Sequence, residues 1–337
     1  MRHIPRGPER AIADAADDSG SARADDAAMT NHPTIIETHG LSKKFGERAA
    51  VIDLELTVPR GCAFGFLGHN GAGKTTLIRM LLGLTTADAG TMLIDGRRMP
   101  EERADVLARV GAIVEEPHFH GHLTGRENLQ VLAAVRGPDA YGRIDGALRR
   151  VGLSDRAGDR VRTYSQGMRQ RLGVARCLLA DPALLILDEP MNGLDPGGIL
   201  EFRTMIAELV GEGRTVFLSS HLLDEVEKTC DAAAVIDRGR LITQGPIDTL
   251  LSGGESELDV GCDDPRTALD VLDGHPAVAS AREIPDGLRL ILAGPDGAAD
   301  INRRLVDAGI AVFRLEPVRE SLEHRFLEIT SRVGASS

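Results

Sequence analysis

The chain has few cysteines and no long apolar run. The four cysteines form no CxxC pair, so their spacing fits neither a disulfide framework nor a zinc site. The most apolar stretch, LLADPALLIL, is interrupted by Asp181 and Pro182, and it is shorter than the roughly 18 uninterrupted residues of a membrane-spanning helix. We therefore expect a chain that does not span a bilayer by itself. The thiols, expected to be core or incidental, are Cys62, Cys177, Cys230 and Cys262.

Positive charge is scarce, because 39 Lys+Arg stand against 51 Asp+Glu and the formal net charge is −12. No region carries the basic excess typical of nucleic-acid binding, so no nucleic-acid partner is expected. The first thirty residues contain no apolar segment of the kind a secretory signal needs, which predicts an intracellular protein. Lysine itself is rare, so a lysine at a special position is informative; the lysines are Lys43, Lys44, Lys74 and Lys228.

At roughly 150 residues per domain, 337 residues suggest about two domains. Residues 1–32 are rich in Ala, Asp, Gly and Ser without apolar periodicity, which predicts a disordered extension. Met29 stands where a folded domain would begin, and we expect that it is the true start of translation. The first domain is then expected over 33–252 and a C-terminal accessory domain over 253–337.

Two kinds of strand are predicted in the first domain. CAFGFLG, ALLILDEP, TVFLSS and AAAVIDRG are short apolar runs, each followed by helix-like sequence. Such runs are typical of strands buried on both faces, so an α/β fold with a mostly parallel core sheet is predicted. TIIETHG, AVIDLELTV and TMLIDG alternate more regularly and favour an antiparallel sheet beside it.

The C-terminal region is expected to be a small α+β domain. The order after Gly253 is strand, helix, strand, strand, helix, strand, which is the ferredoxin-like order. A last helix is predicted from Arg319 to about Thr330. The sequence leaves open whether this domain dimerises, regulates, or only stabilises the protein.

A phosphate-binding loop is predicted at GHNGAGKT, which fits G-x-x-x-x-G-K-[ST] between an apolar strand and a helix. Its glycines let backbone amides close around phosphate oxygens, Lys74 reaches the β- and γ-phosphates, and the Thr75 hydroxyl is a ligand for Mg²⁺. The expected nucleotide contacts in this segment are Gly68, His69, Asn70, Gly71, Ala72, Gly73, Lys74, Thr75 and Thr76.

Two adjacent carboxylates end the apolar strand LLIL. Asp188 is the expected second Mg²⁺ element beside a P-loop. Glu189 is placed to act as general base toward the attacking water. The alternative, two carboxylates in a structural turn before Pro190, loses most of its weight once the P-loop is accepted.

Further motifs resemble the ATP-binding subunit of an ABC transporter. YSQGMRQRL resembles the family signature, NGLD resembles its D-loop, and His221 resembles its switch histidine, all in the family's order over about 34–250. The resemblance implies a P-loop ATPase with a helical subdomain, working as a homodimer with a separate integral-membrane permease. It implies that each ATP lies between the P-loop of one copy and the signature helix of the other. The signature positions are Ser165, Gln166, Gly167 and Met168.

The resemblance also implies roles for three single residues. His221 would contact the γ-phosphate and order the water, and Asp195 would carry the state of one site to the other. Phe45 aligns with the aromatic residue that stacks on adenine; an aromatic before a strand is otherwise usually part of the core, but its π-face suits a base.

Two departures from the family pattern matter. Glu115 in VGAIVEEP stands where the lid glutamine is expected, and Gln166 and Met168 replace the usual signature glycine and glutamine. A carboxylate at 115 can still ligate Mg²⁺ or hold water, although it adds negative charge near the γ-phosphate. Both departures resemble the ATPases of bacitracin and lantibiotic export and self-protection.

The loop HFHGHLTGRENL follows the lid. Three alternating histidines make a metal site conceivable, but no Cys or acidic cluster completes a coordination set there. In the family this segment receives the coupling helix of the permease, so Phe119 and Leu123 are expected as exposed apolar anchors. The alternative is packing within the helical subdomain.

The sequence thus predicts an ATPase, binding ATP and Mg²⁺, that powers export of an antibiotic, peptide or other hydrophobic compound through a separate permease. Its expected location is the cytoplasm, peripheral on the inner face of the membrane. Two alternatives are an importer subunit and a soluble ABC ATPase acting on ribosomes or DNA. The latter is disfavoured because the chain has one ATPase domain, no coiled-coil heptads and no zinc pairs.

Overall fold

The computed structural model describes residues 33–251, 257–294 and 297–318. The predicted N-terminal extension, the proposed start at Met29, the boundary at 252/253 and the helix predicted from Arg319 lie outside the described residues. In the part described, no helix is both long and apolar enough to cross a membrane.

A six-stranded sheet forms the centre of the first domain, in the order β10-β9-β3-β8-β7-β6. Its strands pair in parallel except for β10, which is antiparallel to β9. Strands β3, β7 and β8 belong to the runs predicted to be buried on both faces of the sheet, and every residue of these three strands is buried. The strands are β3 (Ala63–Leu67), β6 (Val110–Ile113), β7 (Leu184–Leu187), β8 (Thr215–Ser220), β9 (Ala232–Asp237) and β10 (Arg240–Pro246).

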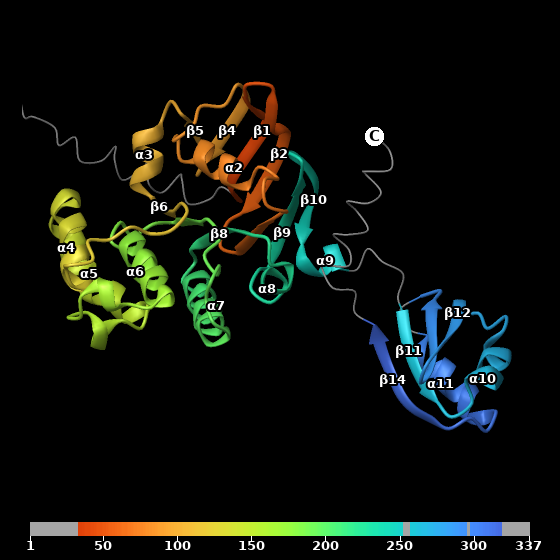
Figure 1. Cartoon of the computed structure of the whole chain (residues 1–337). Coiled ribbons are helices and arrows are strands. Elements are labelled where there is room, and N and C mark those ends of the chain that lie inside the picture. The colour runs from red at the N-terminus through yellow and green to blue at the C-terminus, as the bar shows by residue number, and fades with distance from the viewer. Residues whose placement is uncertain (1–32, 252–256, 295–296, 319–337) are drawn as a thin grey trace, which may run out of the picture.

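The predicted antiparallel sheet is present, in the order β2-β1-β4-β5 (Figure 1, orange). The Gln244 side chain joins the two sheets, since its amide accepts from the Thr57 backbone at 3.0 Å and donates to the Glu55 carbonyl at 3.1 Å. The strands are β1 (Thr34–Phe45), β2 (Arg48–Pro59), β4 (Ala89–Ile94) and β5 (Arg97–Met99).

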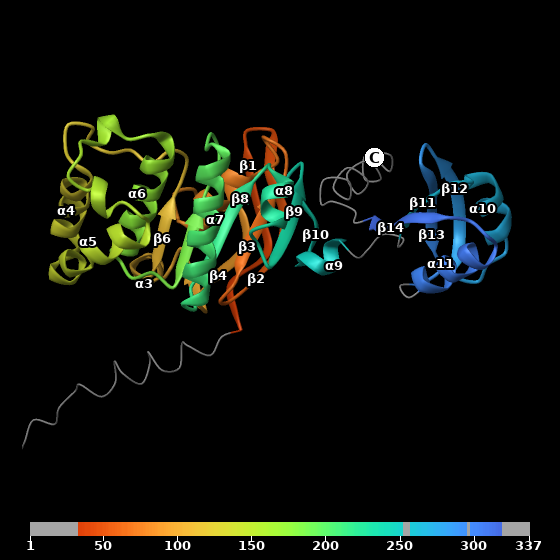
Figure 2. The same ribbon diagram turned by 90° about the horizontal axis from the view of Figure 1, so that it is seen from below.

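A group of helices lies at one end of this domain, on the side away from β10 in both views (Figure 1, Figure 2). The first of them begins with a capping box, in which the Thr124 hydroxyl accepts from the Glu127 amide and the Glu127 carboxylate accepts from the Thr124 amide. The group contains α4 (Gly125–Arg136), α5 (Pro138–Arg150), α6 (Gln166–Leu178) and two short 3₁₀ turns, Ser154–Arg156 and Val161–Thr163. The other helices of the domain are α2 (Lys74–Leu81), α3 (Arg103–Ala108), α7 (Pro196–Gly211), α8 (Leu223–Glu227) and α9 (Ile247–Leu251).

Aromatic packing fixes the middle of the central sheet. Phe217 on β8 lies between Phe64 and Phe66 of β3, with ring centroids 6.0 and 5.7 Å apart. All three rings are buried. These rings pack β3 against β8, and β7 pairs with β8 in parallel. The loops that follow β3, β7 and β8 therefore lie at one edge of the sheet, where ligands bind in such sheets.

The third sheet has the order β12-β13-β11-β14 and is antiparallel throughout. Its element order β-α-β-β-α-β is the ferredoxin-like one. A separate apolar cluster fills it, with Leu258 and Val260 packed against Ile301 and Leu305. The elements are β11 (Glu257–Cys262), α10 (Pro265–Leu272), β12 (Val278–Ile284), β13 (Gly287–Leu292), α11 (Ala298–Asp307) and β14 (Val312–Val318).

All four thiols are free, and three of them are buried. Burial raises the pKa of Cys62 and that of Cys177 to about 11, and it raises the pKa of Cys230 further still. A thiol with a raised pKa carries little thiolate at neutral pH and is a poor nucleophile. The expectation of core or incidental thiols agrees with this placement.

Candidate active site

The P-loop connects β3 to α2, as the motif predicts, and its glycines are required by close backbone approach. Gly73 has φ +115, and a Cβ there would lie 2.3 Å from the carbonyl oxygen of Ala50. A Cβ on Gly68 would lie 2.5 Å from the carbonyl oxygen of Ile236. Neither contact is sterically possible, so β2 and β9 press on the loop and hold its amides in place.

Lys74 is the first residue of α2 and only 5% exposed. Its ammonium donates to the Gly68 carbonyl at 2.6 Å and lies 3.1 Å from Oε1 of Glu189. A buried cation is stable only when it is paired and hydrogen-bonded. The structure thus brings together the two residues that the sequence placed in separate motifs.

The Glu189 carboxylate bridges two catalytic candidates. Its Oε1 faces Lys74, and its Oε2 lies 2.8 Å from Nδ1 of His221. Glu189 also has φ +47, a left-handed conformation that costs a non-glycine residue energy. The turn after β7 therefore holds this carboxylate in a strained position between a cation and an imidazole.

Ser219, which the sequence reasoning missed, connects the two carboxylates. It lies fully buried near the end of β8; its hydroxyl donates to Oδ1 of Asp188 at 2.6 Å and accepts from the Glu189 amide at 2.9 Å. Asp188 itself is 3% exposed. In the sequence, only the spacing of SSH after Glu189 indicated that this segment belongs to the site. The local sequence did not show which of Ser219 and Ser220 contacts the carboxylates.

Replacement of Ser219 by alanine is expected to lower ATP hydrolysis roughly ten- to hundredfold, because a hydrogen bond to a charged group contributes about 1.5–3 kcal/mol. Steady-state phosphate release measures the effect. Ser220→Ala is the matched control, since the Ser220 hydroxyl accepts from the Leu222 amide at 3.0 Å and contacts neither carboxylate in the described part of the chain. Equal rates for the two variants would contradict a positioning role for Ser219.

An open pocket lies beside the P-loop. Phe45 stands at its margin with 53% of its surface exposed, and the Lys43 ammonium lies 5.5 Å from the ring centroid. An exposed ring at a pocket margin is available for stacking on a base, unlike a core aromatic. The pocket is lined by Phe45, Arg48, Ala50, Asn70, Gly71, Gly73, Lys74, Thr75, Thr76 and Glu189.

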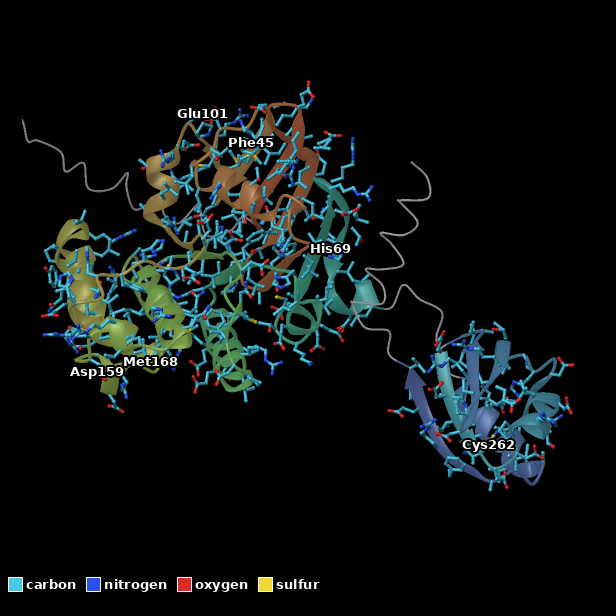
Figure 3. All side chains as sticks on the ribbon, viewed as in Figure 1. Phe45, His69, Glu101, Asp159, Met168 and Cys262 are labelled. Atoms are coloured by element: carbon cyan, nitrogen blue, oxygen red, sulfur yellow. The ribbon has the colours of Figure 1, made fainter. Side chains whose placement is uncertain are left out.

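The signature segment begins α6. Ser165 is the N-cap of this helix, and its hydroxyl accepts from the Met168 amide at 3.2 Å. Gln166 donates to the Asn192 carbonyl at 3.1 Å, which joins the signature to the segment NGLD. No signature residue lines the P-loop pocket of its own chain; Figure 3 shows Met168 and the P-loop residue His69 on different parts of the domain.

Asp195 caps α7, since its carboxylate accepts from the Gly198 amide at 3.1 Å. Pro196 follows at the first helical position, where a missing N–H costs nothing. The Asn192 amide donates to the Glu189 carbonyl at 3.1 Å. The segment from Glu189 to Asp195 is thus one continuous hydrogen-bonded turn between the carboxylates and α7.

Glu115 lies in the lid segment after β6, with φ +60. Its Oε1 is 2.5 Å from the guanidinium of Arg79 in the last turn of α2, and both side chains are well exposed. The structure therefore places this carboxylate against the P-loop helix, and it does not line the P-loop pocket. Arg79 was not among the candidates from sequence because the pair joins separate segments.

Glu115→Gln is expected to retain ATP affinity within about fivefold, because an exposed ion pair contributes no more than about 1 kcal/mol. We expect it to change how much ATP is hydrolysed per substrate transported, since it removes the lid charge that Arg79 faces. Hydrolysis and transport measured together in reconstituted vesicles test this. Glu116→Gln, the exposed neighbour, is the control, and an unchanged ratio in Glu115→Gln would count against a special role.

Phe119 is not the exposed anchor that the sequence predicted. It is partly buried against the apolar core of the helical group, with the Arg176 guanidinium 5.4 Å from its ring centroid. Leu123 is likewise only partly exposed. The expectation of exposure failed because Arg176 of α6 lies over the ring and the ring packs against the core, so the alternative of packing within the helical subdomain is correct for Phe119.

The histidine loop is held by an amide. Asn128 is buried; its side chain donates to the carbonyls of His120 and Thr124 and accepts from the His120 amide. Within the described ranges no group of three metal-ligating side chains is found.

Comparisons with known proteins place the chain in a family. The family model described as ABC transporter matches residues 51–192. The chain is 41% identical to the ABC transporter ATP-binding protein YhcH of Bacillus subtilis, over 88% of this chain and 96% of that one. It is 39% identical to the bacitracin transport ATP-binding protein BcrA of Bacillus licheniformis, over 88% and 97%.

A solved structure shares the fold. It is cbiO1 of Clostridium perfringens, part of the ABC transporter complex cbiONQ, with a TM-score of 0.61, 26% identity and coverage of 66% of this chain and 92% of that one. In this chain the P-loop follows β3, the two carboxylates follow β7, the histidine follows β8 and the signature segment begins α6. The chain belongs to the ATP-binding proteins of ABC transporters and is an ATPase subunit of that family.

Proposed function

We propose that this ATPase works as a homodimer on a separate membrane permease and drives export of a peptide antibiotic or another hydrophobic compound. The supporting observation for the substrate class is the 39% identity to a bacitracin transport ATP-binding protein over nearly its whole length. The Glu115 lid and the SQGM signature support the same branch.

For the nucleotide, we propose that Phe45 stacks on the adenine, and that the P-loop amides and Lys74 bind the phosphates. The residues present fit a Mg²⁺ ion: the Asp188 carboxylate and the Thr75 hydroxyl are oxygen donors of the kind Mg²⁺ prefers. Mg²⁺ would neutralise phosphate charge there. Glu189 takes the proton of the attacking water, and His221 orients Glu189 through the 2.8 Å contact.

For the second half of each site, we propose that Ser165 and Gly167 of the other copy bind the γ-phosphate. A helix N-terminus carries partial positive charge and free amides, which suit an anion. This is supported by the fact that α6 begins at the signature and that these residues do not line the pocket of their own chain. Asp195 would carry the nucleotide state of one ATP site to the other site of the dimer.

Affinity purification of the tagged protein from gently solubilised native membranes tests the transporter role. The Glu189→Gln variant is used to retain the ATP-bound form. Recovery of a polytopic permease, together with increased antibiotic sensitivity when the permease gene is deleted, is the expected result. Recovery of ribosomes or DNA-repair proteins without a membrane protein would overturn the proposal and leave the ATPase assignment intact.

A further inference from the structure

The sheet of the ferredoxin-like domain has two unlike faces. On one face, Leu258 and Val260 of β11 and Leu288 and Leu290 of β13 pack against α10 and α11. Side chains alternate across a strand, so the residues between them point to the opposite face. That second face, which neither α10 nor α11 covers, is called here the charged face.

The charged face carries a row of four charges straight across the sheet. Backbone pairing places Arg282 of β12 opposite Arg289 of β13, Arg289 opposite Asp259 of β11, and Asp259 opposite Glu316 of β14. The sheet order is β12-β13-β11-β14. The row therefore reads positive, positive, negative, negative from one edge to the other.

The two central charges are paired within the chain. Arg289 donates to both carboxylate oxygens of Asp259, at 2.7 and 2.9 Å, and this bidentate bond lowers the pKa of Asp259. The two outer charges cannot pair in the same way. Arg282 and Glu316 are separated by three strand spacings, about 14 Å, and both are exposed.

Such a row is complementary to itself. When two copies pack face to face about a twofold axis parallel to the strands, the order of the row is reversed in the second copy. Arg282 then lies opposite Glu316 of the second copy. In the centre, Arg289 of each copy lies opposite Asp259 of the other. Because the contact is twofold, the dimer contains the Arg282–Glu316 pair two times, once in each direction.

An aromatic side chain supplies the apolar part of the contact. Phe313 of β14 is 67% exposed. A register shift in the pairing of β11 with β14 at Gly261 interrupts the alternation of side chains here, and a Cβ on Gly261, directed to the charged face, would lie 2.6 Å from the Phe313 ring. This next row of paired positions consists of Ile284, Gly287, Gly261 and Arg314. The same twofold axis places Phe313 over Gly287 and Ile284 of the second copy. Gly287 has no side chain, so the ring has room there.

We propose that the charged face is a self-association surface, through which the C-terminal domains of two copies of this chain pair. This contact is additional to the pairing of ATPase domains around ATP, and it requires no nucleotide. It gives the accessory domain the task of keeping two ATPase subunits together between cycles of ATP binding.

The test uses the full chain without nucleotide and with a chelator, so that pairing around ATP does not contribute. Sedimentation equilibrium is expected to show a monomer–dimer equilibrium for the wild type. Arg282→Glu and Glu316→Arg each create two like-charge contacts per dimer, and each is expected to weaken self-association about tenfold or more. Phe313→Ala is expected to weaken it by a similar factor.

A mixture of the two charge variants is the decisive experiment. A dimer of one Arg282→Glu chain and one Glu316→Arg chain has both outer contacts attractive, so mixing equal amounts is expected to restore wild-type association. The double variant is expected to restore it as well. Since the two residues cannot reach each other within one chain, restoration is explained only by pairing between copies.

Three results would overturn the proposal. One is a wild-type chain that remains monomeric at concentrations of tens of micromolar. Another is loss of association in the single variants that mixing does not restore. The third is a set of charge variants that change the melting temperature but not the association, which would show that these charges act within one chain and not between copies. An ATPase that fails to bind a permease would leave this proposal unaffected.

Discussion

Glu189→Gln is expected to lower the rate of ATP hydrolysis by a factor of about 10²–10⁴, the usual contribution of a positioned general base. Glutamine has nearly the shape of glutamate but cannot take a proton from water. Its carbonyl oxygen can still accept from Lys74, and its NH2 group can donate to Nδ1 of His221; these partners lie 3.1 and 2.8 Å from the two carboxylate oxygens of Glu189. ATP affinity is therefore expected to change by no more than a few fold. Single-turnover hydrolysis and equilibrium nucleotide binding measure the two effects separately.

His221 offers a control for this interpretation. If the histidine acts by orienting Glu189, His221→Ala lowers hydrolysis in the wild type but has little further effect in the Glu189→Gln background. Two independent contributions would instead multiply. A Glu189→Gln variant that hydrolyses ATP within tenfold of the wild type would assign the base to another residue.

The parts of this site that the sequence revealed are those encoded in short runs. The P-loop needs glycine where φ is positive or where a neighbouring backbone approaches, and Gly73 meets both conditions. Asp188 and Glu189 follow a doubly buried strand, so their position at the sheet edge follows from the apolar run alone. The parallel sheet, the antiparallel sheet and the ferredoxin-like order were predictable for the same reason, because each strand has a distinct apolar pattern.

The parts that the sequence did not reveal are contacts between distant segments. Ser219 has its role because β8 lies beside β7, and Arg79 meets Glu115 because α2 ends near the lid. Phe119 was predicted to be exposed although Arg176 of α6 covers its ring. Strand β6 is only four residues long and has little pattern of its own. In each case the deciding neighbour belongs to another element, and single-sequence patterns carry no information about it.

Lys74→Ala is expected to weaken ATP binding about a hundredfold and to abolish measurable hydrolysis at low micromolar ATP. The ammonium lies at the start of α2. The hydrogen bonds that we propose it donates to phosphate are charge-assisted, and each such bond contributes about 1.5–3 kcal/mol. Two such bonds account for the expected loss of affinity. The same change removes the cation beside Glu189, so the carboxylate is left near incoming phosphate charge without compensation.

Because the chain has only four lysines, it offers a clean comparison. Lys228→Ala removes an exposed ion pair with Asp224 of α8, and it is expected to leave ATP affinity unchanged. Lys74→Arg tests geometry, since guanidinium keeps the charge but is bulkier than the ammonium that the Gly68 carbonyl accepts at 2.6 Å. Arginine is expected to restore little of the affinity. Titration with a fluorescent ATP analogue measures all three variants, and wild-type affinity in Lys74→Ala would rule out the P-loop lysine as a phosphate ligand.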